Sequence, residues 1–249
     1  MNILITICGR AGSKGIPNKN MRLFFGKPLI DYSIAAACLF KRKHRFDTVD
    51  VCVNSDSDQL LKMAEPYGPI CIKRPEELAL DASPKLPAIR HSLHEMEQEF
   101  GRQYDYVVDL DITSPLRKTA DIESALEKAV KNPDTDVVFS VVSSRRNPYF
   151  NMVEQREGEM RKVLDGGFTA RQQAPKVYDM NASIYCYRRN SLFSKLKQSP
   201  LDGKFDIFLM RDTAVLDLDC EDDFNLLEIL ACYFFQEEFK ELYDYVSRM

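Results

Sequence analysis

The sequence has no excess of positive charge, with 34 lysines and arginines against 38 aspartates and glutamates. The resulting net charge of −4 gives no global field that would attract nucleic acid or an anionic membrane. No apolar run approaches the length needed to cross a bilayer, and the first residues lack a basic leader followed by a cleavage site. The sequence therefore predicts a cytoplasmic protein that binds neither nucleic acid nor membrane, and any site for a polyanion must be local.

Sequence signals for several enzyme classes are missing as well. The seven cysteines form no C-x-x-C pair, which favours reduced, mostly buried thiols over a disulfide framework. His91 and His94 lie three residues apart in a helical stretch without a third ligand nearby, so we interpret them as a surface pair, not a zinc site. Because no histidine adjoins a nucleophile-elbow serine, no Ser-His-Asp arrangement is indicated.

The sequence does contain an alternation of strand-like and helix-like segments. Short connections between such segments predict an α/β fold, with a doubly wound, mostly parallel sheet and helices on both faces. At 249 residues the chain fits one domain, 1–249. The predicted strands are 2–7, 48–53, 69–72, 104–110, 136–142, 183–187 and 213–218, and the predicted helices are 28–40, 57–67, 88–100, 120–131, 222–235 and 237–246.

One segment interrupts this pattern. Between Ser143 and Met180 polar and charged residues dominate, and only short β-like pieces such as 149–153 remain. We interpret 144–180 as a β-rich excursion from the sheet, either a flap or an arm for a partner subunit. A mobile surface insertion is the alternative, since long irregular segments serve either purpose.

A glycine-punctuated loop follows the first strand. Residues 8–20 read CGRAGSKGIPNKN and carry three cations and two asparagines. Glycines let backbone N–H groups approach an anion closely, and the cations balance its charge. The loop is neither a Walker A motif nor a G-x-G-x-x-G fingerprint. It predicts a phosphate site of another kind, with a solvated surface loop as the alternative.

Polar clusters also follow other predicted strands, at 54–56 and 111–117. The carboxyl ends of parallel strands face the same crevice, so these clusters and the 9–20 loop should meet there. Arg117 could contact an anion through a planar, bidentate pair. The stretches 171–173 (Arg-Gln-Gln) and 181–183 (Asn-Ala-Ser) offer a cation and amides for a carboxylate-bearing ligand, although surface roles remain open for both.

Two aspartate pairs could bind a cation. Asp217 and Asp219 would share one face of a strand, and their hard oxygen ligands beside a phosphate loop suggest Mg²⁺. The alternative is an acidic cap for the helix that follows. Asp109 and Asp111 repeat the D-x-D spacing, so they predict a second metal site, a substrate contact by Asp111, or only charges at a strand end.

Together these motifs resemble one family, the CMP-sialate (N-acylneuraminate) cytidylyltransferases. The family's first loop, roughly A-R-x-x-S-K-G-x-x-x-K-N, is similar to residues 9–20, and the match continues in order through 74–79, 113–117, 171–173, 181–185 and 217–219. The string 174–185 looks closer to the bacterial legionaminic acid branch. The departures are Asp111 for the usual Gln, Asp179-Met180 for an Arg and a Pro, and Ala182 for the usual Gly.

The resemblance implies a fold like that of nucleotide-diphospho-sugar transferases, and transfer of CMP from CTP to a nine-carbon 2-keto sugar acid of the legionaminic or N-acylneuraminic type. It also implies a homodimer, in which the excursion reaches the partner. We expect nucleotide binding by Arg10, Ser13, Lys14, Asn20, Arg74 and Ser83, sugar-acid binding by Asp111, Ser114, Arg117, Arg171, Gln172, Gln173, Asn181 and Ser183, Mg²⁺ binding by Asp217 and Asp219, and catalytic roles for Lys14, Lys19 and Asp219.

Other functions remain open from the sequence alone. A metal-dependent glycosyltransferase would use Asp109 and Asp111 as its D-x-D motif and bind a finished nucleotide sugar. A non-catalytic nucleotide-sugar sensor would bind CTP without releasing pyrophosphate. For the transferase, Asp219 and Asp111 are both candidates for the general base.

Overall fold

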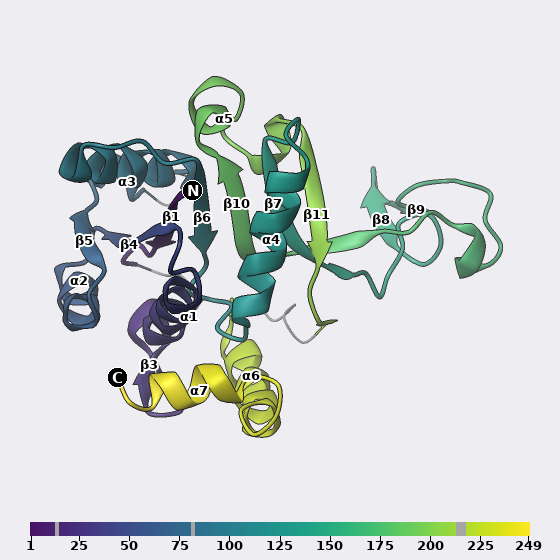
Figure 1. Cartoon of the computed structure of the whole chain (residues 1–249). Helices are drawn as coiled ribbons and strands as arrows, with labels where there is room; N and C mark the ends of the chain where they lie inside the picture. The colour runs from purple at the N-terminus through teal and green to yellow at the C-terminus, as the bar shows by residue number, and fades with distance from the viewer. Residues whose placement is uncertain (13–14, 81–82, 213–217) are drawn as a thin grey trace.

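The computed structural model describes residues 1–12, 15–80, 83–212 and 218–249. Its centre is a seven-stranded sheet in the order β11-β7-β10-β6-β1-β4-β5 (Figure 1). Among these strands only β10 runs antiparallel to its neighbours, so the prediction of a mostly parallel α/β sheet is confirmed. The strands are β1 (Asn2–Cys8), β4 (Thr48–Ser55), β5 (Ile70–Lys73), β6 (Tyr106–Leu110), β7 (Val137–Ser143), β10 (Tyr178–Arg188) and β11 (Phe205–Leu209).

Helices cover both faces of the sheet, which explains why β1 is apolar along nearly its whole length. Ile3, Ile5 and Ile7 join one buried cluster, whereas Leu4 and Cys8 join the other. Helices with side chains in the first cluster are α1 (Leu29–Lys43), α2 (Asp58–Ala64), α4 (Thr119–Lys131), α6 (Glu221–Phe234) and α7 (Lys240–Val246). Helices with side chains in the second are α3 (Lys85–Phe100) and α5 (Arg189–Ser194).

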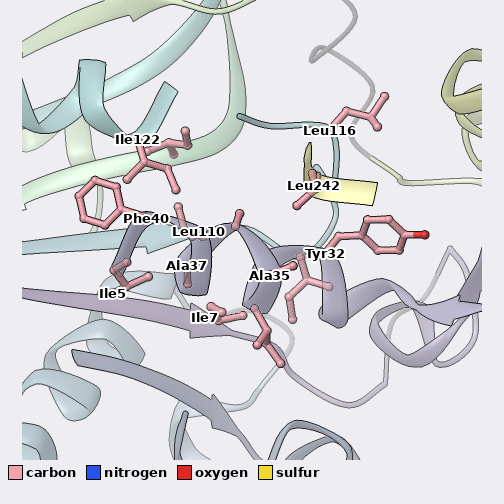
Figure 2. Packing of buried hydrophobic residues seen from close by; sticks show 14 of the residues in the cluster. Ile5, Ile7, Tyr32, Ala35, Ala37, Phe40, Leu110, Leu116, Ile122 and Leu242 are labelled. Carbon is pink, nitrogen blue, oxygen red and sulfur yellow. The ribbon is translucent and has the colours of Figure 1, made fainter. Parts of the chain in front are cut away.

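The first cluster is the larger core and is built around α1. Figure 2 shows the alanines and aromatic rings of α1 between Ile5 and Ile7 of β1 and residues from α4 and α7. Ala35 and Ala37 are fully buried, because small side chains let this helix lie close to the sheet. The packing fixes the carboxyl ends of β1 and β6, where the predicted polar clusters lie.

The remaining elements are short. Two small antiparallel pairs are β2 (Leu23–Phe24) with β3 (Lys27–Pro28), and β8 (Val153–Arg156) with β9 (Glu159–Lys162). The β8–β9 hairpin belongs to the 144–180 excursion and projects away from the sheet on the side of β11 (Figure 1). The 3-10 helices are η1 (Lys19–Met21), η2 (Glu65–Tyr67), η3 (Glu76–Leu78), η4 (Arg171–Gln173) and η5 (Pro200–Asp202).

Some boundaries differ from the sequence-based prediction. The edge strand β11 was not predicted, while most of the predicted strand 213–218 lies outside the described residues. β10 begins at Tyr178, five residues before the predicted strand, because its first half pairs with β7 ahead of a β-bulge. Among the described residues, no helix combines the length and the apolar character needed to cross a bilayer.

Candidate functional site

A cavity of about 410 Å³ opens beyond the carboxyl ends of β1, β5 and β6. This position is the one expected for a ligand site in a doubly wound sheet, and the volume suits a small molecule. The predicted site residues that line it are Arg10, Lys19, Asn20, Arg74, Ser83, Asp111 and Asp219. The predicted residues Ser13, Lys14 and Asp217 lie outside the described part of the chain.

Backbone hydrogen bonds hold the 9–20 loop against the end of β4. Gly9 N donates to Asn54 O at 3.1 Å, and Ala11 N donates to Asp56 Oδ1 at 2.9 Å. A Cβ atom at Gly9 would lie 2.7 Å from Ile112 Cδ1, so a larger residue here would displace the end of that side chain. The structure thus brings the 9–20 and 54–56 clusters together, as the sequence predicts.

The same loop also contacts Asp219, 200 positions from Lys19 in the sequence. Lys19 Nζ donates to Leu218 O and lies 3.3 Å from Asp219 Oδ1. A Cβ atom at Gly15 would lie 1.9 Å from Asp219 O, so the two backbones touch. The Asp219 side chain is 79% exposed, which leaves its carboxylate accessible to a ligand in the cavity.

Arg74 reaches the cavity from the loop after β5. It is 6% exposed, and its Nε donates to Asn54 Oδ1 at 2.6 Å. The side-chain nitrogen of Asn54 lies 3.1 Å from His91 Nδ1. His91 is half-buried, and its ring lies beside the asparagine that orients Arg74, a role that the sequence did not indicate.

Lys85 is a cavity residue that the sequence analysis missed. Its ammonium lies 2.7 Å from Asp109 Oδ2 and 2.7 Å from Asp111 Oδ2. No local motif marks this lysine, since the contact arises only when the fold brings the start of α3 to the end of β6. The D-x-D pair is therefore already bridged by a cation of the protein itself.

Lys85 also sets the charge state of Asp111. Burial alone would raise the pKa of this carboxyl group, but the Lys85 ammonium and hydrogen bonds from Thr113 outweigh burial and lower the pKa to about 2. A carboxylate with so low a pKa accepts a proton poorly near neutral pH. The low pKa therefore counts against Asp111 as the general base.

Cys8 lines the same cavity but is suited to packing, not to chemistry. Burial raises the pKa of its thiol to about 12. Because the thiolate is the nucleophilic form, this cysteine is inert near neutral pH.

Several predicted residues lie outside the cavity as the described residues define it. Arg117 is fully buried and donates hydrogen bonds to the carbonyl oxygens of Asp111 and Ser114, so it holds the 111–117 loop in shape. Ser114 is 2% exposed. Arg117 thus supports the backbone of Asp111 from outside the cavity.

The other predicted residues lie on β10 and on the excursion. Asn181 and Ser183 are buried beside the bulge, and Ser183 O accepts a hydrogen bond from Asp111 N at 3.1 Å. Residues 171–173 form η4 on the exposed excursion, where Arg171 Nη2 donates to Ser144 O at 2.9 Å. In this single chain, η4 is not part of the cavity lining that the described residues form.

A magnesium ion in this site would need oxygen ligands. Within the described ranges, no three His, Cys, Asp or Glu side chains converge on one point. Asp219 provides one accessible carboxylate, the oxygen donor that Mg²⁺ prefers.

Comparisons with known proteins extend these observations. A family model described as "Cytidylyltransferase" matches residues 4–244. The chain is 40% identical to the CMP-N,N'-diacetyllegionaminic acid synthase of Campylobacter jejuni over 231 residues, which cover 92% of this chain and 94% of that protein. It is 29% identical to the N-acylneuraminate cytidylyltransferase of Streptococcus agalactiae serotype V, covering 97% of this chain and 55% of that protein.

A solved structure is also similar. It is described as a CMP:2-keto-3-deoxy-manno-octonic acid synthetase complexed with CTP, and it aligns with a TM-score of 0.69 over 94% of this chain and 99% of that chain. The sequence identity is 16%, so this likeness shows a shared fold.

Proposed function

The chain belongs to the cytidylyltransferase family, and from this premise we propose that it transfers CMP from CTP to the anomeric hydroxyl of a nine-carbon 2-keto sugar acid, releasing pyrophosphate. The legionaminic type of acid is favoured over the N-acylneuraminic type. The 40% identity to the legionaminate synthase spans nearly the full length of both chains, whereas the streptococcal relative is 29% identical.

One observation carries the proposal. The cationic loop after β1 and the carboxylate of Asp219 meet at the same cavity, where Lys19 lies beside Asp219. A free triphosphate needs such a combination, because cations and backbone amides hold its oxygens while a carboxylate provides a position for a metal ion.

Catalysis would rest on positioning and on charge stabilisation, as in other phosphoryl-type transfers. Arg10, Lys19 and Arg74 all line the cavity, where they can hold the triphosphate and stabilise charge on the departing pyrophosphate. The buried Asn54 fixes the guanidinium of Arg74, so little ordering is needed when the nucleotide binds.

We further propose that Asp219, together with Asp217, holds Mg²⁺. The exposed carboxylate of Asp219 fits this ion by the chemistry of its oxygen atoms. The ion would screen the triphosphate and make the attacking hydroxyl more acidic. The low pKa of Asp111 argues against that residue as the acceptor of the hydroxyl proton.

Three further proposals concern the sugar acid, the homodimer and the location of the protein. The sugar acid would bind beside Asp111, and η4 with its Arg171 would reach the site of the other subunit in a homodimer. The exposed position of η4, away from its own cavity, supports this arrangement. All seven cysteines are free, which supports a cytoplasmic location.

The glycosyltransferase alternative has less support. It requires a metal ion between Asp109 and Asp111, but the Lys85 ammonium lies between these carboxylates.

The reaction is tested by measuring pyrophosphate release with each of the four nucleoside triphosphates. The acceptors offered are legionaminic, N-acetylneuraminic, pseudaminic and 3-deoxy-octulosonic acids. We expect release with CTP and legionaminic acid above all other pairs, with Mg²⁺ required. No release with any pair, or equal release with all four nucleotides, would contradict the proposal.

The same assay examines Asp219. Asp219→Ala should lower kcat by about a hundredfold or more, with an unchanged melting temperature. Asp134→Ala is the matched control, because Asp134 is an 80% exposed acid whose nearest ion-pair partner is Lys204 at 3.7 Å. Turnover that survives in Asp219→Ala would remove Asp219 from the mechanism.

A further inference from the structure

The Asp109–Asp111 pair has an arrangement that the proposed reaction does not by itself explain. Both carboxylates lie on β6 or directly after it, and Asp109 is fully buried. Asp109 Oδ1 accepts a hydrogen bond from Thr6 Oγ1 at 2.8 Å, and Asp111 Oδ1 accepts one from Thr113 Oγ1 at 2.9 Å. The two remaining oxygens each lie 2.7 Å from Lys85 Nζ.

These contacts define a position for a cation. Two carboxylates with this spacing on a strand can share a divalent ion through one oxygen each. The ammonium of Lys85 lies at the shared point and is supplied by the first turn of α3. Because Lys85 is part of the chain, its ammonium occupies this position at any concentration of metal ion. It therefore always neutralises part of the charge of Asp109 and Asp111.

We propose that Lys85 is the resident cation of the Asp109–Asp111 pair, where it keeps a divalent ion out and holds Asp111 in place as a hydrogen-bond acceptor facing the substrate. Lys85 is thus a positioning residue, and the metal ion of the reaction is confined to the Asp219 side of the cavity. The role toward substrate rests on the proposed function, whereas the exclusion of a metal ion does not.

The charge states agree with this geometry. Burial would lower the pKa of the Lys85 ammonium, but the two carboxylates outweigh burial and raise it well above its usual value. Lys85 therefore stays charged near neutral pH. Without it, two carboxylates would lie side by side at the edge of a cavity that must accept a triphosphate and a sugar acid, both anions.

The first test counts metal sites in the protein without substrate. Mn²⁺ is titrated into the wild type, Lys85→Ala and Lys85→Arg, and free Mn²⁺ is followed by electron paramagnetic resonance. We expect Lys85→Ala to bind one more Mn²⁺ than the wild type, and Lys85→Arg to match the wild type, because arginine retains the positive charge.

The matched control is Lys195→Ala. The Lys195 ammonium lies 2.8 Å from the buried Asp136, but that contact involves a single carboxylate. Its removal should add no Mn²⁺ site. An unchanged Mn²⁺ count in Lys85→Ala would overturn the proposal. Failure of Lys85→Ala to fold at any Mn²⁺ concentration would do the same, since the ion should replace the missing ammonium.

The second test measures turnover. Lys85→Ala should lower kcat/KM for pyrophosphate release by about tenfold or more, and Lys85→Arg should remain within about threefold of the wild type. An equal loss of kcat/KM in both variants would show that the shape of the side chain matters and its charge does not. That result would contradict the positioning role of Lys85. If the wild type releases no pyrophosphate, the proposed function fails, while the Mn²⁺ count still decides whether Lys85 fills the cation position.

Discussion

At the residue scale, buried charges differ in how well their surroundings compensate them. Asp111 has an ammonium and two hydrogen-bond donors from Thr113, and its pKa falls to about 2. Asp31, in the first turn of α1, is fully buried, and burial raises its pKa to about 6 because the charge of Lys27 compensates only in part. A carboxylate whose pKa rises on folding destabilises the folded protein wherever it must be ionised.

Asp31 therefore gives a pH-dependent prediction of stability. The folded state binds the proton more tightly than the unfolded state, whose pKa is near 4, so stability falls as pH rises from about 4 to above 6. Asp31→Asn should be more stable than the wild type at pH 8 by on the order of 1 kcal/mol, or about 2–4 °C in melting temperature. The gain should disappear near pH 4, as measured by thermal unfolding across this range.

The control for this effect is Asp58→Asn. Asp58 also lies in the first turn of a helix, but it is exposed, and a hydrogen bond from Lys73 lowers its pKa. Its substitution should not stabilise the protein at any pH. A gain for Asp31→Asn that is equal at pH 4 and pH 8 would show that its charge is not the cause.

At the element scale, the bulge in β10 joins the sheet to the site. Pairing with β7 shifts between Met180 and Tyr185, and Ala182 within the bulge has φ +50°. Directly after it, Ser183 O accepts the hydrogen bond from Asp111 N. The CMP-sialate cytidylyltransferases that this sequence resembles usually have glycine at the position of Ala182. Glycine adopts positive φ with the least strain.

This conformation predicts how Ala182 responds to substitution. Ala182→Gly should leave the free energy of unfolding unchanged or raise it by up to about 1 kcal/mol, because relief of strain offsets the added freedom of the unfolded chain. Ala182→Val should lower it by about 2 kcal/mol or more, since β-branched residues are strained at positive φ. Urea unfolding measures both values.

Ala174 provides the comparison, because its φ of −73° is favourable for alanine. Ala174→Gly should lower stability slightly through backbone entropy alone, by about 0.5–1 kcal/mol. If Ala182→Gly is destabilised as much as Ala174→Gly, the bulge does not strain the alanine.

The same scale shows what the sequence could predict. β1, β4 and β6 are buried on both faces, so each could be predicted from its run of apolar residues. The polar clusters were then found because they directly follow these runs. β11 was not predicted from the sequence, because it is a half-exposed edge strand of five residues that pairs with β7 alone. Lys85 was not predicted for another reason. Its partners Asp109 and Asp111 are distant in the sequence, and no local spacing of residues indicates such a contact.

At the scale of the whole molecule, the β8–β9 hairpin has two unlike faces. Its register places Val153, Gln155, Met160 and Lys162 on one face and four charged residues on the other. The charged face carries ion pairs within each strand, Glu154 with Arg156 and Glu159 with Arg161. Val153 and Met160 are 64% and 65% exposed. An isolated two-stranded hairpin is marginally stable in water, so the exposed Val153 and Met160 need a cover.

The proposed homodimer supplies that cover and predicts the effect of charging this face. Val153→Lys combined with Met160→Lys should convert the dimer to a monomer in size-exclusion chromatography with light scattering. Pyrophosphate release should fall by about tenfold or more, because η4 on the same excursion would no longer reach the other subunit. Arg156→Ala, on the charged face, should leave both dimer and turnover intact. A monomeric wild type with full turnover would show that one chain completes its own site, and η4 would then have no role across subunits.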